Sequence, residues 1–115
     1  MPIEVKGRKK GNEMLRVSNM ISDASGREIA NQFIIESDNK TLFQSYSSPI
    51  VEIDWTNHIL TVYPHWDYSV TTSKYRNMFM RDNHFYDMAD KKGFERCMKE
   101  GKASTGRTEY TVKVA

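Results

Sequence analysis

The residues best suited to chemistry or binding lie between Tyr63 and Phe79, which read YPHWDYSVTTSKYRNMF. Aromatic rings alternate there with hydroxyl, carboxylate and cationic side chains, where a strand-like pattern gives way to a helix-like one. Rigid elements on either side of such a junction can present its side chains on the surface of a small domain. The predicted partner-binding residues are two rings and two cations of this stretch: Trp66, Tyr68, Lys74 and Arg76.

A catalytic role for the same stretch would need a nucleophile beside a base that a third group orients. Asp67, Ser69 and Lys74 offer the residue types, but no GxSxG-like turn surrounds the serine. Capping of the following helix by Asp67 or Ser69 is the simpler interpretation. Neither GxGxxG nor GxxxxGKS/T occurs, so the sequence has no glycine-rich phosphate loop. We expect a protein that is not an enzyme and has no cofactor.

The three histidines and the single cysteine are the candidates for metal or thiol chemistry. His58, His65 and His84 are scattered without HxH or HxxxH spacing, whereas a zinc site normally needs three or four ligands. We therefore predict no metal site. Cys97 lies at an apolar position of a predicted helix beside Met98, which favours a small core residue over a nucleophile.

The composition is that of a polar, globular chain. It has 115 residues, of which 38% are hydrophobic and 28% charged, and this length fits one domain. No segment approaches the roughly 18 apolar residues of a membrane-spanning helix. The N-terminal residues MPIEVKGRKKG lack the apolar stretch of a secretory signal. We expect a cytoplasmic protein that makes no contact with a membrane.

The net charge of +2 conceals an uneven distribution. Residues 1–12 carry four basic side chains and one acidic one, residues 13–90 carry six and eleven, and residues 91–115 carry seven and three. Basic ends often contact nucleic acid or acidic partners, although short ones also occur as solvated tails. We interpret residues 1–12 as a flexible basic arm beside a single domain of residues 13–115. Its auxiliary contact residues are Arg8, Lys9 and Lys10.

Alternating apolar and polar residues predict a run of strands, and changes of period predict helices. The strands are expected at 29–36, 41–46, 51–55 and 59–63, with a last one at 110–114, while residues 14–20 fit a strand or a short helix. The helices are expected at about 71–81 and 84–100, with Gly101 as a C-terminal cap.

The predicted fold is therefore α+β, with an antiparallel meander of four to five strands and two helices packed on one face. The last strand is expected to rejoin the sheet. The predicted core consists of Phe33, Ile35, Phe43, Val51, Ile53, Leu60, Val62, Tyr75, Phe79, Met88, Phe94, Cys97 and Met98.

Two kinds of partner fit the ring-rich stretch. Single-stranded nucleic acid is held by stacked rings and cations, which Trp66 and Tyr68 beside Lys74 and Arg76 supply. Acidic residues of the predicted sheet, such as Glu52, would repel phosphates. A protein partner is the other possibility, because Trp, Tyr and Arg most often anchor protein interfaces. An aromatic stripe at helical spacing is also typical of a core, so inward rings can build the core while outward ones bind.

Three segments of the chain carry a resemblance to a family: FQSYSSPIVEID (43–54), HWDYSVTTSKYRNMF (65–79) and KKGFERCMKEG (91–101). They resemble small uncharacterised proteins encoded by phages, plasmids and integrated elements of Firmicutes and gut bacteria. The most specific piece is a W-D/N-Y-S-x-T-T-x-K/R-Y pattern, which Trp66 to Tyr75 satisfies. The resemblance covers roughly residues 30–101 and implies a genomic setting without implying any catalytic residue.

That setting implies a partner class. Small proteins of mobile elements often bind and block host machinery, including CRISPR effectors. The resemblance therefore implies a non-catalytic inhibitor of a bacterial defence system, anti-CRISPR-like, that binds a host nuclease or nucleoprotein complex. A module that binds RNA or single-stranded DNA is the alternative. A chain of net charge +2 lacks the dense acidic surface of a duplex-DNA mimic, so an inhibitor would act by covering a protein surface or a guide RNA.

Overall fold

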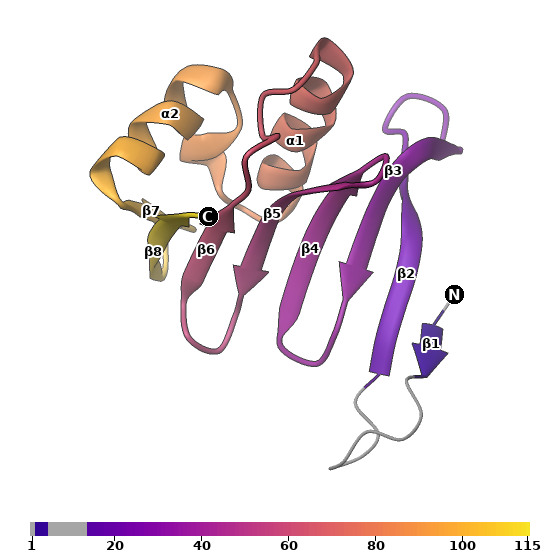
Figure 1. Cartoon of the computed structure of the whole chain (residues 1–115), viewed down its shortest axis with the longest axis horizontal. Coiled ribbons are helices and arrows are strands. Elements are labelled where there is room, and N and C mark those ends of the chain that lie inside the picture. Colours follow the sequence, from indigo (N-terminus) through magenta and orange to yellow (C-terminus); the bar gives the residue numbers. More distant parts are fainter. Residues whose placement is uncertain (1, 5–13) are drawn as a thin grey trace.

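The chain forms an α+β fold in which one mixed sheet carries two helices (Figure 1). The computed structural model describes residues 2–4 and 14–115. The strands are β1 (Pro2–Glu4), β2 (Met14–Ile21), β3 (Glu28–Glu36), β4 (Lys40–Ser45), β5 (Ser48–Asp54), β6 (Ile59–Val62), β7 (Lys102–Ser104) and β8 (Glu109–Val114). The helices are α1 (Val70–Asp82), the short 3₁₀ helix η1 (Tyr86–Met88) and α2 (Lys91–Glu100).

Strands β3 to β6 form the predicted antiparallel meander, with tight turns between them. In the β5–β6 turn, Asp54 accepts hydrogen bonds from the backbone N–H groups of Asn57 (2.9 Å) and Thr56 (3.1 Å). These bonds, first of all the one from Asn57, lower the pKa of Asp54. A short polar side chain that bonds to the next backbone groups is what such a turn requires.

The sheet differs from the prediction in its extent and its direction. Its order is β1-β2-β3-β4-β5-β6-β8-β7, so it includes strands beyond the predicted four or five. The last strand does rejoin the sheet, but β8 runs parallel to β6. A parallel pair needs a long crossover, and residues 63–108 provide it through α1, η1 and α2.

The second helix is shorter than predicted because its start is fixed by a cap. The Asp90 side chain accepts a hydrogen bond from the N–H of Gly93 at 2.7 Å, so α2 begins at Lys91, and η1 occupies part of the predicted helix before it. Gly101 ends α2 in a left-handed conformation at φ 76°, which confirms the predicted cap.

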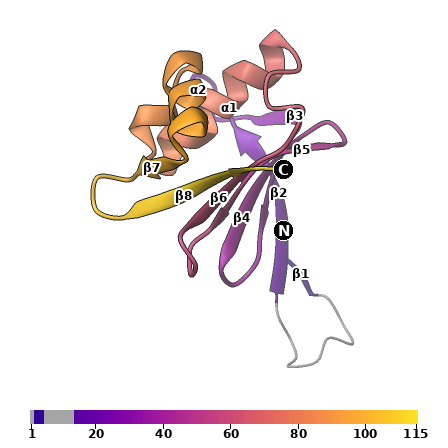
Figure 2. The ribbon, with the colours of Figure 1, turned by 60° about the vertical axis from the view of Figure 1, so that its left-hand side comes forward.

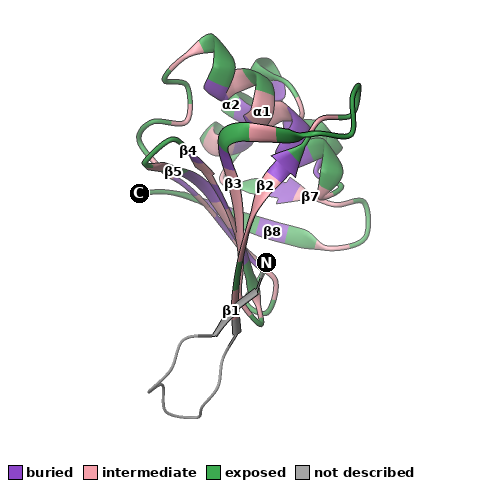
Figure 3. Ribbon diagram, turned by 90° about the vertical axis from the view of Figure 1, so that its right-hand side faces the viewer, coloured by how far each residue is buried: buried purple, intermediate pink, exposed green. Residues whose placement is uncertain are grey.

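Both helices lie over the same side of the sheet (Figure 2), and buried positions gather where they cover it (Figure 3). Predicted core residues that are buried there are Phe43, Val51, Ile53, Leu60, Val62, Phe79, Met88, Phe94 and Cys97. Tyr75 and Met98 are half-buried and pack against this cluster. None of the helices that the structure describes is long and apolar enough to cross a membrane.

The prediction was wrong for Phe33 and Ile35. In the β3–β4 register Ile34 pairs with Phe43, and this places Ile34 on the helix-covered face. Neighbouring residues of a strand point to opposite faces, so Phe33 and Ile35 lie on the other face, paired with Gln44 and Leu42, and are only half-buried.

Replacement of Gly93 tests the contact between α2 and η1. A β-carbon at this position would collide with the backbone carbonyl oxygen of Asp87, so Gly93→Ala must displace the backbone of one element. We expect it to lower the free energy of unfolding by about 2 kcal/mol. Urea denaturation measures the change. The neighbouring exposed variant Lys92→Ala is the control, within about 0.5 kcal/mol of wild type; an equally stable Gly93→Ala would contradict the contact.

Candidate interaction site

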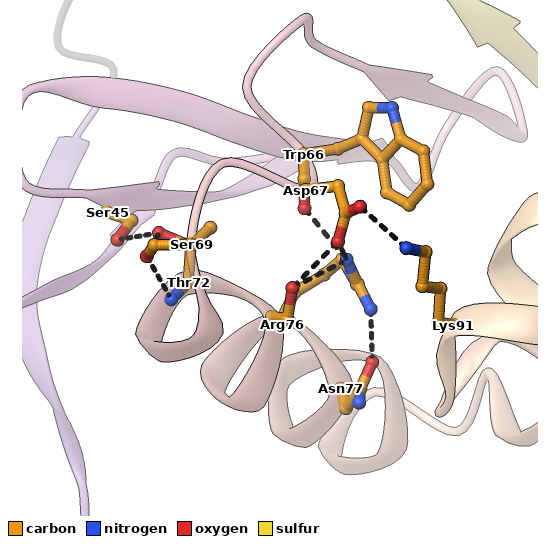
Figure 4. A network of polar contacts seen from close by, with 9 residues as sticks. Ser45, Trp66, Asp67, Ser69, Thr72, Arg76, Asn77 and Lys91 are labelled. Carbon is orange, nitrogen blue, oxygen red and sulfur yellow. Dashed lines mark hydrogen bonds and ion pairs between the residues drawn. The ribbon is translucent and has the colours of Figure 1, made fainter.

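A buried arginine lies at the centre of the predicted corner (Figure 4). Arg76 of α1 has a fully buried side chain (0% exposed). Its Nη1 donates to the carbonyl oxygen of Trp66 at 2.8 Å, and its Nη2 donates to Oδ1 of Asn77 at 2.8 Å. The guanidinium carbon lies 5.3 Å from the ring centre of Trp66 and 4.8 Å from that of Phe94. The group thus has both hydrogen-bond and cation–π partners.

Asp67 is the counter-ion of this arginine and links it to α2. Its Oδ1 lies 3.6 Å from Nη1 of Arg76 and accepts a hydrogen bond from the Ser73 hydroxyl at 2.9 Å. Its Oδ2 lies 2.9 Å from Nζ of Lys91, the first residue of α2. The bond from Lys91 is the main cause that lowers the pKa of Asp67. Burial lowers the pKa of Arg76, and Asp67 opposes this effect, while the guanidinium stays charged.

A chain of hydroxyl groups joins the start of α1 to the sheet. The Ser69 side chain caps α1 by accepting a hydrogen bond from the N–H of Thr72 at 3.1 Å. The Thr72 hydroxyl lies 3.2 Å from that of Ser69 and 3.0 Å from that of Ser45, at the end of β4. The first turn of α1 is therefore tied to the β4–β5 turn through side chains that are largely buried.

A surface pocket of about 570 Å³ opens between these two segments. We call it the tyrosine pocket, and it is lined by Ser45, Tyr46, Ser47, Ser48, Ile50, His65, Tyr68, Ser69, Thr71 and Thr72. Hydroxyl groups predominate in this lining, and no lysine, arginine, aspartate or glutamate contributes to it. The pocket can therefore offer many neutral hydrogen bonds and two aromatic rings to a ligand.

Tyr46 stands at the pocket in an unusual backbone conformation. It lies in the left-handed region at φ 56°, in the two-residue turn between β4 and β5. A glycine normally occupies such a position, because a side chain there is strained. Two hydrogen bonds hold the conformation. The N–H of Tyr46 donates to the carbonyl oxygen of Asn31 (2.7 Å), and the Gln44 side chain donates to the carbonyl oxygen of Tyr46 (2.9 Å). The side chain is 52% exposed.

Tyr68 supplies the second ring and is 73% exposed, as the sequence predicted for a residue that binds a partner. Its ring lies nearly perpendicular to that of His65, with ring centres 5.3 Å apart. The backbone N–H of Tyr68 also donates to the carbonyl oxygen of His65 at 3.1 Å, in the turn that precedes α1. His65 therefore supports the Tyr68 ring at the edge of the pocket.

The other predicted contact residues are placed differently. Arg76 is sequestered inside the corner, so it does not lie on the surface where we expected it. Trp66 is half-buried and stacks on Phe94, with ring centres 5.2 Å apart. Lys74 is exposed, with its Nζ 5.2 Å from the ring centre of Tyr75, and it does not line the tyrosine pocket. Arg8, Lys9 and Lys10 lie outside the described residues.

Sequence reasoning missed Tyr46 and the serines around it. The available signal was a bulky residue at the centre of a tight turn, in the string Ser45-Tyr46-Ser47-Ser48, where glycine or asparagine is usual. The predicted cap Ser69 is confirmed.

The remaining candidates for chemistry have structural roles or stand apart. No three His, Cys, Asp or Glu side chains within residues 2–4 and 14–115 gather as a metal site would require. Cys97 is buried, which confirms its core role, and burial raises the pKa of its thiol. A thiol with a raised pKa is a poor nucleophile at neutral pH.

Fold and site together define a small α+β domain with a neutral, hydroxyl-lined surface pocket beside a buried arginine. Residues 16–96 match the model of a family of unknown function (DUF8033), and the chain belongs to this family. The matched range contains the Arg76 network and the tyrosine pocket, and it ends within α2, before β7 and β8. No curated protein and no solved structure matches the chain.

Replacement of Asp67 tests whether the buried guanidinium depends on its counter-ion. We expect Asp67→Asn to destabilise the fold by about 2 kcal/mol at pH 7, less than for a fully enclosed pair because Asp67 is one-third exposed. Denaturation with urea measures the loss. The matched control is Asp23→Asn, which removes the exposed ion pair with Arg81 and should change stability by about 0.5 kcal/mol or less.

The pH dependence of the same variant follows from the lowered pKa of Asp67. The ionised carboxylate of Asp67 stabilises the fold at pH values above 3.8, the ordinary pKa of aspartate. This contribution to stability disappears as the pH falls through the lowered pKa of the folded state. The stability difference between wild type and Asp67→Asn should therefore be constant from pH 5 to 7 and shrink below pH 3.8. A constant difference down to acid unfolding would show that the charge of Asp67 does not matter.

Proposed function

We propose that this chain is a non-catalytic interaction protein that seats a segment of a partner protein in the tyrosine pocket. The observation that carries the proposal is Tyr46, a large aromatic side chain held in a left-handed conformation at the pocket, half exposed to solvent. Backbone strain of this kind persists where the side chain has a use that outweighs it. Tyr68, the more exposed of the two tyrosines of the pocket, supplies a second anchor.

The chemistry of the lining supports a protein partner at this corner over a nucleic acid. Phosphate recognition needs cations, and no cationic side chain lines the tyrosine pocket. Arg76 would have been the nearest cation, but its guanidinium is buried on Trp66 and Asn77. Neutral hydroxyl groups around two tyrosines suit an extended peptide, whose backbone N–H and C=O groups can pair with them. Tyrosine is also among the residues that most often dominate binding energy at protein interfaces.

The class of partner is the more specific part of the proposal. The likeness to small proteins of mobile elements favours a host nuclease or nucleoprotein complex of a bacterial defence system. Occlusion of a protein surface is the mode of action that fits, because the chain has a net charge of +2 and cannot imitate duplex DNA. The support for this partner is the family resemblance, whereas the support for the binding surface is the geometry of Tyr46 and Tyr68.

Replacement of Tyr46 by glycine separates binding from folding. Glycine removes a backbone strain of about 1–2 kcal/mol from the folded state. Part of this gain in stability is lost again, because glycine also gives the unfolded chain more conformational freedom. We therefore expect Tyr46→Gly to melt at the wild-type temperature or slightly above it, and to lose its partner. Affinity capture from a lysate of the host bacterium, followed by mass spectrometry, identifies the proteins retained by wild type. Tyr68→Ala should lose the same proteins.

The matched control is His58→Gly. His58 is also left-handed, at φ 56°, but it lies in the β5–β6 turn and does not line the pocket. The His58→Gly variant should retain every protein that the wild type binds. The proposal fails if folded Tyr46→Gly and Tyr68→Ala retain those partners as well.

A further inference from the structure

A second surface pocket, of about 420 Å³, shares no residue with the first. We call it the His84 pocket, and it is lined by His84, Tyr86, Thr105 and Arg107. These residues come from three separate segments: the loop after α1, helix η1 and the turn between β7 and β8. Residues distant in the sequence thus bring an imidazole, two hydroxyl groups and a guanidinium to one place.

Hydrogen bonds position the polar groups of this pocket. Nδ1 of His84 lies 3.0 Å from the Tyr86 hydroxyl, and the two ring centres are 5.9 Å apart. Thr105 Oγ1 accepts hydrogen bonds from the N–H groups of Thr108 (3.2 Å) and Arg107 (3.4 Å). These bonds fix the turn and leave the hydroxyl proton of Thr105 free to donate.

His84 occupies a backbone position that favours glycine. It is left-handed at φ 69°, directly after Asn83, the C-cap of α1, and its N–H donates to the carbonyl oxygen of Arg81 at 3.0 Å. Most helices that end in this way have glycine there, because other side chains are strained. A histidine in its place brings an imidazole ring to the pocket at the expense of backbone strain.

The charge of the pocket lining points to an anionic ligand. No carboxylate lines it, and Arg107 makes no ion pair with any part of the chain that the structure describes. Helix α2, which connects η1 to β7, exposes Lys92, Arg96 and Lys99 at spacings of four and three. Such residues lie along one side of a helix, and these three also have no ion-pair partner among the described residues.

We propose that the His84 pocket binds a nucleotide unit of a single-stranded nucleic acid. The phosphate accepts hydrogen bonds from Arg107, Thr105 and His84, and the base stacks on Tyr86. Arginine offers a planar fork of donors that matches phosphate oxygens. The Tyr86 side chain is 61% exposed, as a stacking platform must be.

Fluorescence anisotropy tests the proposal with labelled 12-nucleotide RNA and DNA strands at low salt. Adenosine monophosphate serves as competitor. A labelled phosphoserine peptide with the same charge as adenosine monophosphate is tested for binding in a separate titration. We expect the strands to bind the full-length protein, with affinity that falls steeply as salt rises. Arg107→Gln should weaken binding about tenfold, the usual effect of losing a charge-assisted contact to phosphate. His84→Gly should weaken binding while its melting temperature stays at or above that of the wild type, an effect that a purely structural histidine would not show.

Lys113→Gln is the matched control, since it removes the same charge from an exposed position outside the pocket. Full competition by the mononucleotide at equal concentration would assign the pocket to a free nucleotide, and affinity that rises with strand length would assign it to a strand. Each of these results supports nucleotide recognition. The proposal is overturned if neither the strands nor the mononucleotide bind, if Lys113→Gln weakens binding as much as Arg107→Gln, or if only the phosphopeptide binds.

Discussion

The burial of one guanidinium group organises this end of the molecule. A buried charge is tolerated only when its partners are in place, and removal of a partner leaves it uncompensated. The partners of Arg76 come from the loop before α1 (Trp66 and Asp67) and from α1 itself (Asn77), while Phe94 of α2 contacts its π face. The loop cannot move without disturbing the contacts of Arg76 with Trp66 and Asp67. A residue predicted to touch a partner thus has a different task, which is to fix the support of the exposed ring of Tyr68.

The two pockets differ in the charge of their lining residues. The tyrosine pocket is neutral and lies against a polar part of the core, where Gln32, the cross-strand neighbour of Ser45, is fully buried. Neither side-chain amide atom of Gln32 has a hydrogen-bond partner among the described residues. Buried amides usually find partners, so Gln32 is an exception within this core. The His84 pocket is cationic instead. One small domain thereby carries a neutral pocket and a cationic one on separate surfaces.

The sequence predicted local structure well because turns and caps depend on near neighbours. Asp54 and Asn57, Ser69, and Gly101 each act within a few residues. Alternation in β3 is not strict, because Ile29 and Ile34 both pack against the core and Asn31, left-handed at φ 65°, lies between them. No local signal showed which residues would face the helices, so Phe33 and Ile35 were assigned to the wrong face. Arginine is seldom fully buried, and the environment of Arg76 is created by residues distant in the chain. Its spacing of four from Thr72 and three from Phe79, both buried, was the available hint.

The parallel pairing of β6 with β8 governs the order in which this sheet can be completed. Each strand of the meander from β3 to β6 pairs with the next strand along the chain. In contrast, Leu60 of β6 pairs with Val112 of β8, about fifty residues later in the sequence. Contacts of such long range form late, because the intervening chain must first be ordered. Until residues 109–114 become available, the backbone of β6 therefore presents an open edge, to which another extended chain could add. Strand β8, which lines neither pocket, thus covers the edge of β6 in the folded protein.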